Sequence, residues 1–203
     1  MQIISRLSLS VLLFSFILSA CGSGNGNSNS TSSNDNNVIN IKISLSISGG
    51  YDTDPRDNGR PILLIAAALN VPPDVFREAF SHVTPAPAGQ EPDPAQVKLN
   101  KEALLKVLSP YGVTNDRLDE VSNYYRYNGS AGEAWPRTPA KLAVVVTDGK
   151  LTGIKIINGG SGYSSTPTIT ITGVEGVTAT ATISYTTNFE TNGSITNVSL
   201  TTK

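Results

Sequence analysis

The stretch LAVVVTDGKLTGIKII, residues 142–157, decides the fold of the C-terminal part of the chain. Two runs rich in β-branched residues flank Asp148-Gly149. An Asp-Gly pair favours a two-residue hairpin turn, because both residues tolerate the positive φ angles that such a turn requires. The stretch therefore predicts an antiparallel hairpin with strands at 142–146 and 151–157.

The same pattern recurs further along the chain. Asp148-Gly149-Lys150-Leu151-Thr152-Gly153-Ile154 matches Asn192-Gly193-Ser194-Ile195-Thr196-Asn197-Val198. Alternating apolar and polar residues at 167–172 and 177–185 predict further strands, and Asn192-Gly193 predicts another turn. We expect residues 141–203 to form an antiparallel β region with two related hairpin units.

Between these units lies the glycine-rich stretch GGSGYSSTPTITITG, residues 159–173. It resembles β-repeats that are common in secreted and surface-exposed bacterial proteins. The resemblance implies extracellular scaffolding rather than one activity. The block from Thr53 to Tyr127 also resembles an uncharacterised family of exported bacterial proteins, which implies no particular activity.

A further strand is predicted well before this β region. Five apolar residues alternate with polar ones: Ile39, Ile41, Ile43, Leu45 and Ile47. Such alternation indicates a strand with one buried face, and Gly49-Gly50 ends it. The buried face needs a partner. Pairing with the C-terminal sheet would make one domain, whereas the helical middle of the chain could also pack as a separate unit.

The middle of the chain carries helix signals, with helices expected over 61–69, from Pro73, after Asp93 with Gln96 in a capping box, and after Thr114 or Asn115. We expect the third helix to bury Val97, Leu104, Leu105 and Leu108, and the fourth to bury Leu118, Val121 and Tyr125. Residues 38–140 are therefore predicted to be mainly helical with a leading strand. The predicted fold class is α+β, with an N-terminal strand, about four helices and C-terminal antiparallel β-hairpin repeats.

The first residues have the pattern of an export signal. Arg6 precedes an apolar run from Leu7 to Ile17, which is too short to span a membrane. The following Leu18-Ser19-Ala20-Cys21 resembles the lipobox of bacterial lipoproteins. The resemblance implies a signal peptide at 1–20, diacylglycerol on the Cys21 sulfur, and acylation, for example with palmitate, of the new amino terminus. The alternative is an ordinary signal peptide with a chance cysteine.

Residues 22–37 contain only Gly, Ser, Asn, Thr and one Asp, so they cannot bury apolar surface. We expect residues 21–37 to form a lipidated flexible tether. The localisation that follows is the bacterial cell envelope, with membrane lipid as a partner through Cys21. In Gram-negative bacteria, Gly22 after the cysteine favours the outer membrane.

Composition excludes several classes of function. The chain has 15 basic and 16 acidic residues, so it lacks the positive charge that nucleic-acid binding requires. Its one cysteine and one histidine, His82, leave no disulfide and no zinc site built from those residues.

Three aspartates in one loop suggest a metal. Asp52, Asp54 and Asp57 are closely spaced, and carboxylate oxygens suit calcium. The EF-hand pattern is not met, because Arg56 and Asp57 stand at its fifth and sixth positions. The alternative is a set of loop carboxylates that cap the next helix and pair with Arg56 or Arg60.

Aromatic residues suggest a second kind of site. Tyr124, Tyr127 and Trp135 could offer apolar ring faces to a sugar, such as a cell-wall polysaccharide, or to a peptide. The alternative is core packing of these rings.

No catalytic or cofactor motif is found in the sequence. The leading hypothesis is therefore a non-enzymatic, membrane-anchored envelope lipoprotein that presents a binding or scaffolding domain, with another envelope protein as one candidate partner. The alternatives are a metal-dependent envelope hydrolase that uses Asp52, Asp54 and Asp57, and a carbohydrate-binding surface protein.

Overall fold

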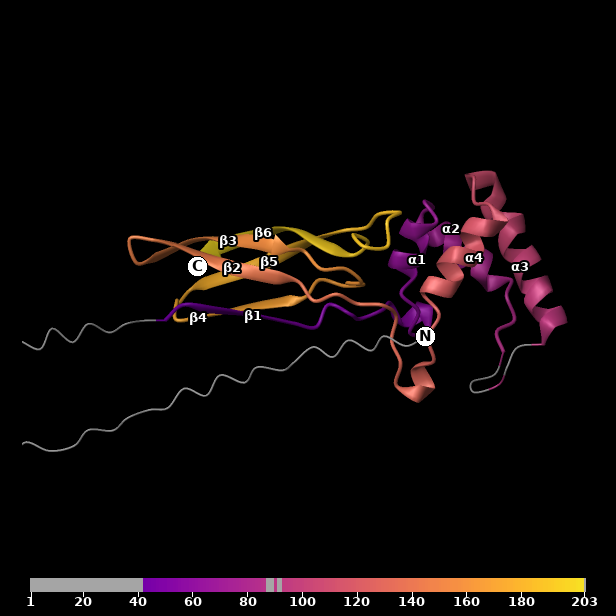
Figure 1. The fold of residues 1–203 in the computed structure, drawn as a ribbon, viewed down its shortest axis with the longest axis horizontal. Helices are drawn as coiled ribbons and strands as arrows, with labels where there is room; N and C mark the ends of the chain where they lie inside the picture. The colour runs from indigo at the N-terminus through magenta and orange to yellow at the C-terminus, as the bar shows by residue number, and fades with distance from the viewer. Residues whose placement is uncertain (1–41, 87–89, 91–92, 203) are drawn as a thin grey trace, which may run out of the picture. The chain divides into compact units, whose positions relative to one another are not determined.

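The computed structural model describes residues 42–86, 90 and 93–202 (Figure 1). Along this part of the chain a short strand is followed by four α-helices and then by five strands. This order confirms the predicted α+β class. The predicted signal peptide at 1–20 and the predicted tether at 21–37, with Cys21, lie outside the described residues.

The first strand, β1 (Ser44–Ser48), is part of the C-terminal sheet. It pairs antiparallel with β4 (Thr168–Thr172), so that Leu45 lies opposite Ile171 and Ile47 opposite Ile169. The sheet continues through β5 (Val177–Ser184) and β6 (Ser194–Thr202), in the order β1-β4-β5-β6. The alternating residues of β1 therefore find their partner in a strand more than a hundred residues further along the chain.

The hairpin predicted from residues 142–157 is confirmed. Its strands are β2 (Lys141–Thr147) and β3 (Lys150–Asn158), which pair antiparallel as a separate two-stranded sheet. Asp148 has a φ of 50° and Gly149 a φ of 73°, as a tight Asp-Gly turn requires.

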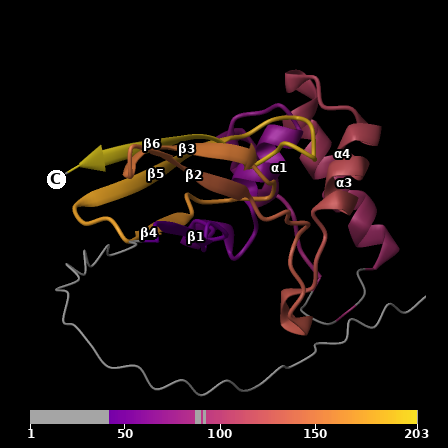
Figure 2. The same cartoon turned by 60° about the vertical axis from the view of Figure 1, so that its left-hand side comes forward.

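The two sheets share one core. Tyr163, Ile169, Ala181 and Ile195 are buried, and residues of both sheets, among them Leu142 and Ile154 on β2 and β3, pack against them. The strands that follow the two related turns, β3 and β6, meet at one end, where the Ile195 amide donates to the Gly159 carbonyl at 2.9 Å (Figure 2). The two related hairpin units thus contribute to different sheets.

The helical part contains α1 to α4 and three short 3-10 turns. The Asp93 side chain caps α3 by accepting from the Ala95 amide, and Thr114 caps α4 by accepting from the Arg117 amide. Gln96 instead donates to Asn100, so a reciprocal capping box does not form. The bounds are α1 (Ile62–Ala68), α2 (Pro73–Ser81), α3 (Pro94–Leu108), α4 (Asn115–Tyr124), η1 (Pro55–Asp57), η2 (Ser109–Tyr111) and η3 (Gly129–Ala131).

The helical core uses most of the residues that periodicity predicts. Leu118, Val121 and Tyr125 of the α4 face are buried, as is Leu108 of α3. The prediction for Val97 is wrong, because this side chain is 44% exposed. One turn further along α3, Asn100 makes hydrogen bonds with the backbone of Thr84, so polar contacts to a loop occupy this part of the helix. Within the described ranges, no helix combines the length and the apolar character that crossing a membrane demands.

Buried polar contacts join the helices to the sheets, and the chain from residue 42 onward belongs to one compact unit. Asn192, which precedes β6, is fully buried and donates to the Leu64 carbonyl at 2.7 Å and to the Tyr125 hydroxyl at 2.9 Å. The related residue of the first unit, Asp148, lies in an exposed turn. Asn192-Gly193 therefore ends a longer connection, residues 185–193, that contacts the helices.

Candidate functional site

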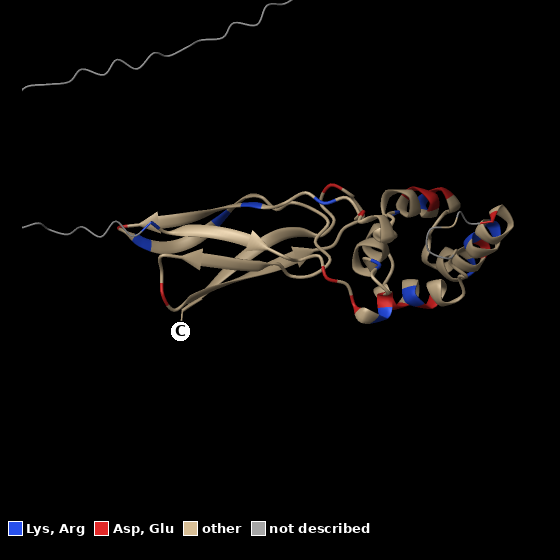
Figure 3. Cartoon of the chain, turned by 90° about the horizontal axis from the view of Figure 1, so that it is seen from below, with Lys and Arg blue, Asp and Glu red and all other residues tan. Residues whose placement is uncertain are grey.

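Charged residues are concentrated in the helical part, whereas the sheets contain few (Figure 3). Their densest group surrounds η1. Asp54 caps this turn by accepting from the Arg56 amide, and its carboxylate receives the Arg56 guanidinium at 3.0 Å from Nε and 2.7 Å from Nη2. The hydrogen bonds from Arg56 lower the pKa of Asp54 from its ordinary 3.8 to about 2.

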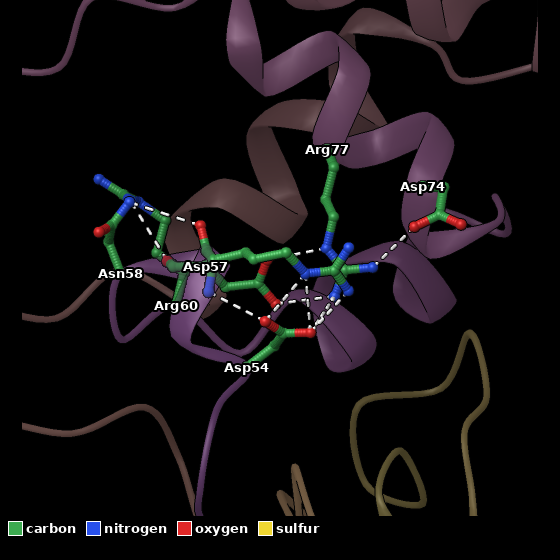
Figure 4. Close-up of polar contacts among 7 residues, drawn as sticks. Asp54, Asp57, Asn58, Arg60, Asp74 and Arg77 are labelled. Atoms are coloured by element: carbon green, nitrogen blue, oxygen red, sulfur yellow. Dashed lines mark hydrogen bonds and ion pairs between the residues drawn. The ribbon is translucent and has the colours of Figure 1, made fainter.

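Arg77 of α2 ties this turn to the helix (Figure 4). Its Nε and Nη2 donate to the two carboxylate oxygens of Asp57 at 2.8 and 2.9 Å, and its Nη1 donates to Asp74 at 2.8 Å. The Asp57 side chain is only 4% exposed, so this two-bond pairing replaces its lost hydration. The hydrogen bond with Asp57 raises the pKa of Arg77 above its ordinary value. Arg77 is therefore held in place by its aspartate partners.

Arg60 differs from the other half-buried arginines of the described chain. Arg77 and Arg117 contact carboxylates, the latter through Glu120 at 2.6 Å. No described carboxylate lies within ion-pair distance of Arg60. Its Nη1 donates to the Asp57 carbonyl at 3.3 Å, and its guanidinium carbon lies 4.6 Å from the centre of the Phe80 ring. Most of its N–H donors thus have no acceptor among the described residues.

Arg60 lines three hollows, one of which, of about 270 Å³, also has Asp54 and Asp57 in its lining. The other two contain fewer carboxylates. The first, of about 390 Å³, lies between η1 and α2. Its charged lining consists of three arginines and one aspartate, Arg56, Asp57, Arg60 and Arg77, and Ile62 and Phe80 form its apolar wall. The second, of about 280 Å³, lies between α1, α2, α3 and α4. It is lined by Arg60 and Arg126 together with apolar and aromatic side chains, among them Phe76, Phe80, Leu104, Val121 and Tyr127.

The second hollow carries more net positive charge for its volume than the first. Its described lining contains two arginines and neither aspartate nor glutamate. Arg126 is exposed, and none of the ion pairs among the described residues includes it. The arrangement offers guanidinium donors at the rim of an apolar hollow, which suits the oxyanion head of a small organic molecule.

The three loop aspartates proposed as a calcium site do not all come together: Asp54 and Asp57 both lie beside Arg77, at 3.8 and 2.9 Å from its Nη2, whereas Asp52 contacts Ser165. Asp54 is bound by Arg56 and Asp57 by Arg77, whereas Asp52 accepts from the Ser165 hydroxyl at 3.2 Å. Among the residues that the structure describes, no three His, Cys, Asp or Glu side chains are grouped as a metal site would need. The alternative interpretation predicts carboxylates that cap the next helix and pair with Arg56 or Arg60. Asp54 pairs with Arg56 as predicted, but it caps η1 and not α1, which has no side-chain cap. Asp57 pairs with Arg77 rather than with Arg60, a partner that was not predicted.

The three aromatic residues proposed as a platform fall into two clusters. Tyr124 stacks on Phe189 with ring centres 4.1 Å apart. Tyr127 instead meets Trp135 edge to face at 5.6 Å, and its hydroxyl donates to the Gly59 carbonyl. In this conformation the rings do not share one surface.

Trp135 is buried rather than offered to solvent. It is 5% exposed, and its indole N–H donates to the Gly162 carbonyl at 2.9 Å. The Arg137 guanidinium lies 4.0 Å from the Trp135 ring centre and 4.3 Å from that of Tyr51, which in turn stacks on Tyr163. Core packing accounts for Trp135, because this ring connects the chain after α4 to the glycine-rich loop.

No sequence pattern predicted the hollow at Arg60. Arg60 and Arg126 are far apart in the sequence, and neither belongs to a recognisable motif. The nearest signal is the proximity of Arg60 to the apolar run that starts at Pro61, which places a charge next to buried residues.

The comparisons with known proteins give no relative. No family model, no curated protein and no solved structure matches the chain.

Proposed function

We propose that the protein is a lipid-anchored protein of the bacterial cell envelope that presents a ligand-binding α+β domain. The observation that carries this proposal is Leu18-Ser19-Ala20-Cys21 after a charged start and an apolar run, followed by a tract without apolar residues. Several acyl chains on one cysteine give a stable membrane anchor, because each methylene group buried in the bilayer contributes about 0.8 kcal/mol.

The way the chain enters the described domain supports this proposal. β1 runs from Ser44 to Ser48 and leads through Gly49 and Gly50 to the helical part. The start of β1 thus lies at the same end of the sheets as the β2–β3 turn, and the helices follow from the other end (Figure 1). The described chain therefore begins at the end of the sheets away from the helices and from the hollows at Arg60 (Figure 1).

The binding part of the proposal is supported by the charged hollows rather than by a catalytic arrangement. Asp54 and Asp57, the carboxylates that a hydrolase would use, are bound by Arg56 and Arg77. Arg60, by contrast, lines three hollows, and most of its N–H donors have no acceptor among the described residues.

Metabolic labelling tests the anchor. Wild-type protein expressed in a bacterial host is expected to incorporate radiolabelled palmitate and to sediment with membranes. Cys21→Ser is expected to lose the label, whereas Ser19→Ala, which keeps a small residue beside the cleavage site, keeps it. Label on the Cys21→Ser protein, or none on the wild type, would refute lipidation at this cysteine.

A further inference from the structure

We propose that Arg60 and Arg126 bind the oxyanion head of a small organic anion whose apolar body occupies the hollow beside Phe76 and Phe80. The assignment deepens the proposed function by naming the class of ligand that the domain binds. The head is a carboxylate or a phosphate, because a guanidinium pairs with either through two parallel hydrogen bonds.

The first support is the energetic situation of Arg60. A half-buried guanidinium loses part of its hydration, and a structure ordinarily compensates that loss with a carboxylate or several acceptors. Arg77, on the neighbouring helix, is compensated by Asp57 and Asp74. Arg60 receives a single described acceptor, the Asp57 carbonyl, at a long 3.3 Å. A bound anion would supply the missing acceptors.

The second support is the preorganisation of Arg60. The Phe80 ring lies against its guanidinium at 4.6 Å, and the ring stacks in turn with Phe76 at 5.9 Å. A ring against the flat face of a guanidinium leaves the N–H edge free for a ligand. The Arg77–Asp57 pair fixes the turn from which the Arg60 backbone starts, since the Arg60 amide donates to the Asp57 carbonyl at 3.0 Å.

The third support is the composition of the hollow. Its volume of about 280 Å³ suits a molecule with one ring or a short chain, and its described lining has no acidic residue to repel an anion. The apolar contribution comes from all four helices and the segment after them, for example Ile65, Phe76, Leu104 and Val121. The hollow combines positive charge with apolar surface, so we expect it to bind an anion with an apolar body more tightly than an inorganic ion.

Calorimetric titration of the purified full-length processed protein in detergent-matched buffer tests the proposal. The probes are benzoate and phenyl phosphate, which carry an apolar ring and the two alternative heads. Acetate supplies a head without a ring, and benzyl alcohol a ring without a charge. We expect at least one of the first two probes to bind at millimolar concentration and more tightly than acetate and benzyl alcohol. The tighter of the two identifies the head.

Variants of the two arginines decide where the probe binds. Arg60→Gln and Arg126→Gln are each expected to weaken binding about tenfold, the cost of one charge-assisted hydrogen-bonded contact. Arg60→Lys keeps the charge but loses the paired N–H donors of the guanidinium. Its affinity for the probe is expected to lie between those of Arg60→Gln and the wild type. Lys98→Gln, an exposed change on α3 outside the hollow, serves as the matched control and is expected to bind as the wild type does.

Three results would overturn the proposal: no binding of either anionic probe, equal binding of benzyl alcohol, or unchanged affinity in both arginine variants. Circular dichroism of each variant separates loss of binding from loss of fold, and the exposed Arg126 provides a variant that removes no described contact. Because the titration does not depend on whether Cys21 carries lipid, its failure and the failure of the anchor are distinguishable.

Discussion

The side-chain amide of Asn192 donates to the carbonyl oxygen of Leu64 at 2.7 Å, which joins the start of β6 to α1. The other groups of the same side chain are used as well: the amide also donates to the Tyr125 hydroxyl, and its oxygen accepts from the Thr186 amide at 3.1 Å. One fully buried polar residue thus connects the start of β6 with α1, with the C-terminal end of α4 and with the loop that precedes β6. This contact explains how a helical part and a β part form one unit.

Replacing Asn192 with alanine is expected to destabilise the domain by about 3 kcal/mol, because buried acceptors and donors lose their partner. The matched control is Asn197→Ala on the exposed side of β6, for which we expect a change within about 0.5 kcal/mol. Urea unfolding followed by circular dichroism measures both. Equal stability of the two variants would show that Asn192 does not hold the helices to the sheets.

Glycine at 193 is required by both its conformation and its surroundings. Its φ is +69°, and a Cβ atom there would lie 2.5 Å from the Tyr163 carbonyl oxygen and 2.6 Å from a Leu64 methyl group. The related Gly149 has a φ of +73° with open space around it. Gly149→Ala is therefore expected to cost about 1–2 kcal/mol from backbone strain alone. Gly193→Ala is expected to lower the free energy of unfolding by about 1–3 kcal/mol more than Gly149→Ala, because the added methyl group overlaps its neighbours.

Urea midpoints of the two glycine variants check this difference. The pair is informative because the two positions correspond in the repeat and have similar φ angles, +73° and +69°. If Gly149→Ala and Gly193→Ala lowered stability equally, steric contact at Gly193 would contribute nothing.

Local sequence signals predicted most of the fold. The Asp148-Gly149 turn, the alternating residues of β1 and the caps at Asp93 and Thr114 each depend on residues a few positions apart, so periodicity and turn chemistry are enough to find them. The Asn192-Gly193 pair shows the limit. It has the same local chemistry as Asp148-Gly149, but its role depends on Leu64 and Tyr125, which only the tertiary fold brings near.

The candidate site was predicted less well for the same physical reason. The loop aspartates were recognised, and Asp54 pairs within its own turn. The arginine that pairs with Asp57 belongs to α2. The contact between the Arg60 guanidinium and the Phe80 ring also depends on how α2 packs against the turn. Trp135 was proposed for a surface because it lies near Tyr124 and Tyr127 in the sequence, yet it is buried, and the glycine-rich loop supplies a carbonyl to its indole N–H.

The lowered pKa of Asp54 gives the stability a pH dependence at acid pH. The ionised carboxylate is favoured in the folded state, so its contribution is present above the ordinary pKa of 3.8 and is lost as the pH falls through about 2. Asp54→Asn is therefore expected to be less stable than wild type at pH 5, with a difference that narrows towards pH 2. Urea midpoints at pH 5, 3 and 2 measure it. Glu175→Gln, in the exposed β4–β5 turn, is the control, and a pH-independent difference for Asp54→Asn would exclude the carboxylate charge as its source.

Calcium is expected to leave the thermal unfolding midpoint unchanged at millimolar concentration, although the spacing of Asp52, Asp54 and Asp57 suggested a site. To bind the ion, Asp54 and Asp57 would have to give up the guanidinium groups of Arg56 and Arg77, and Asp52 would have to move from Ser165. Differential scanning fluorimetry with calcium and with chelator tests this, with magnesium as the control for ionic strength. A saturable rise in midpoint with calcium that Asp54→Asn removes would establish a metal site that includes this carboxylate.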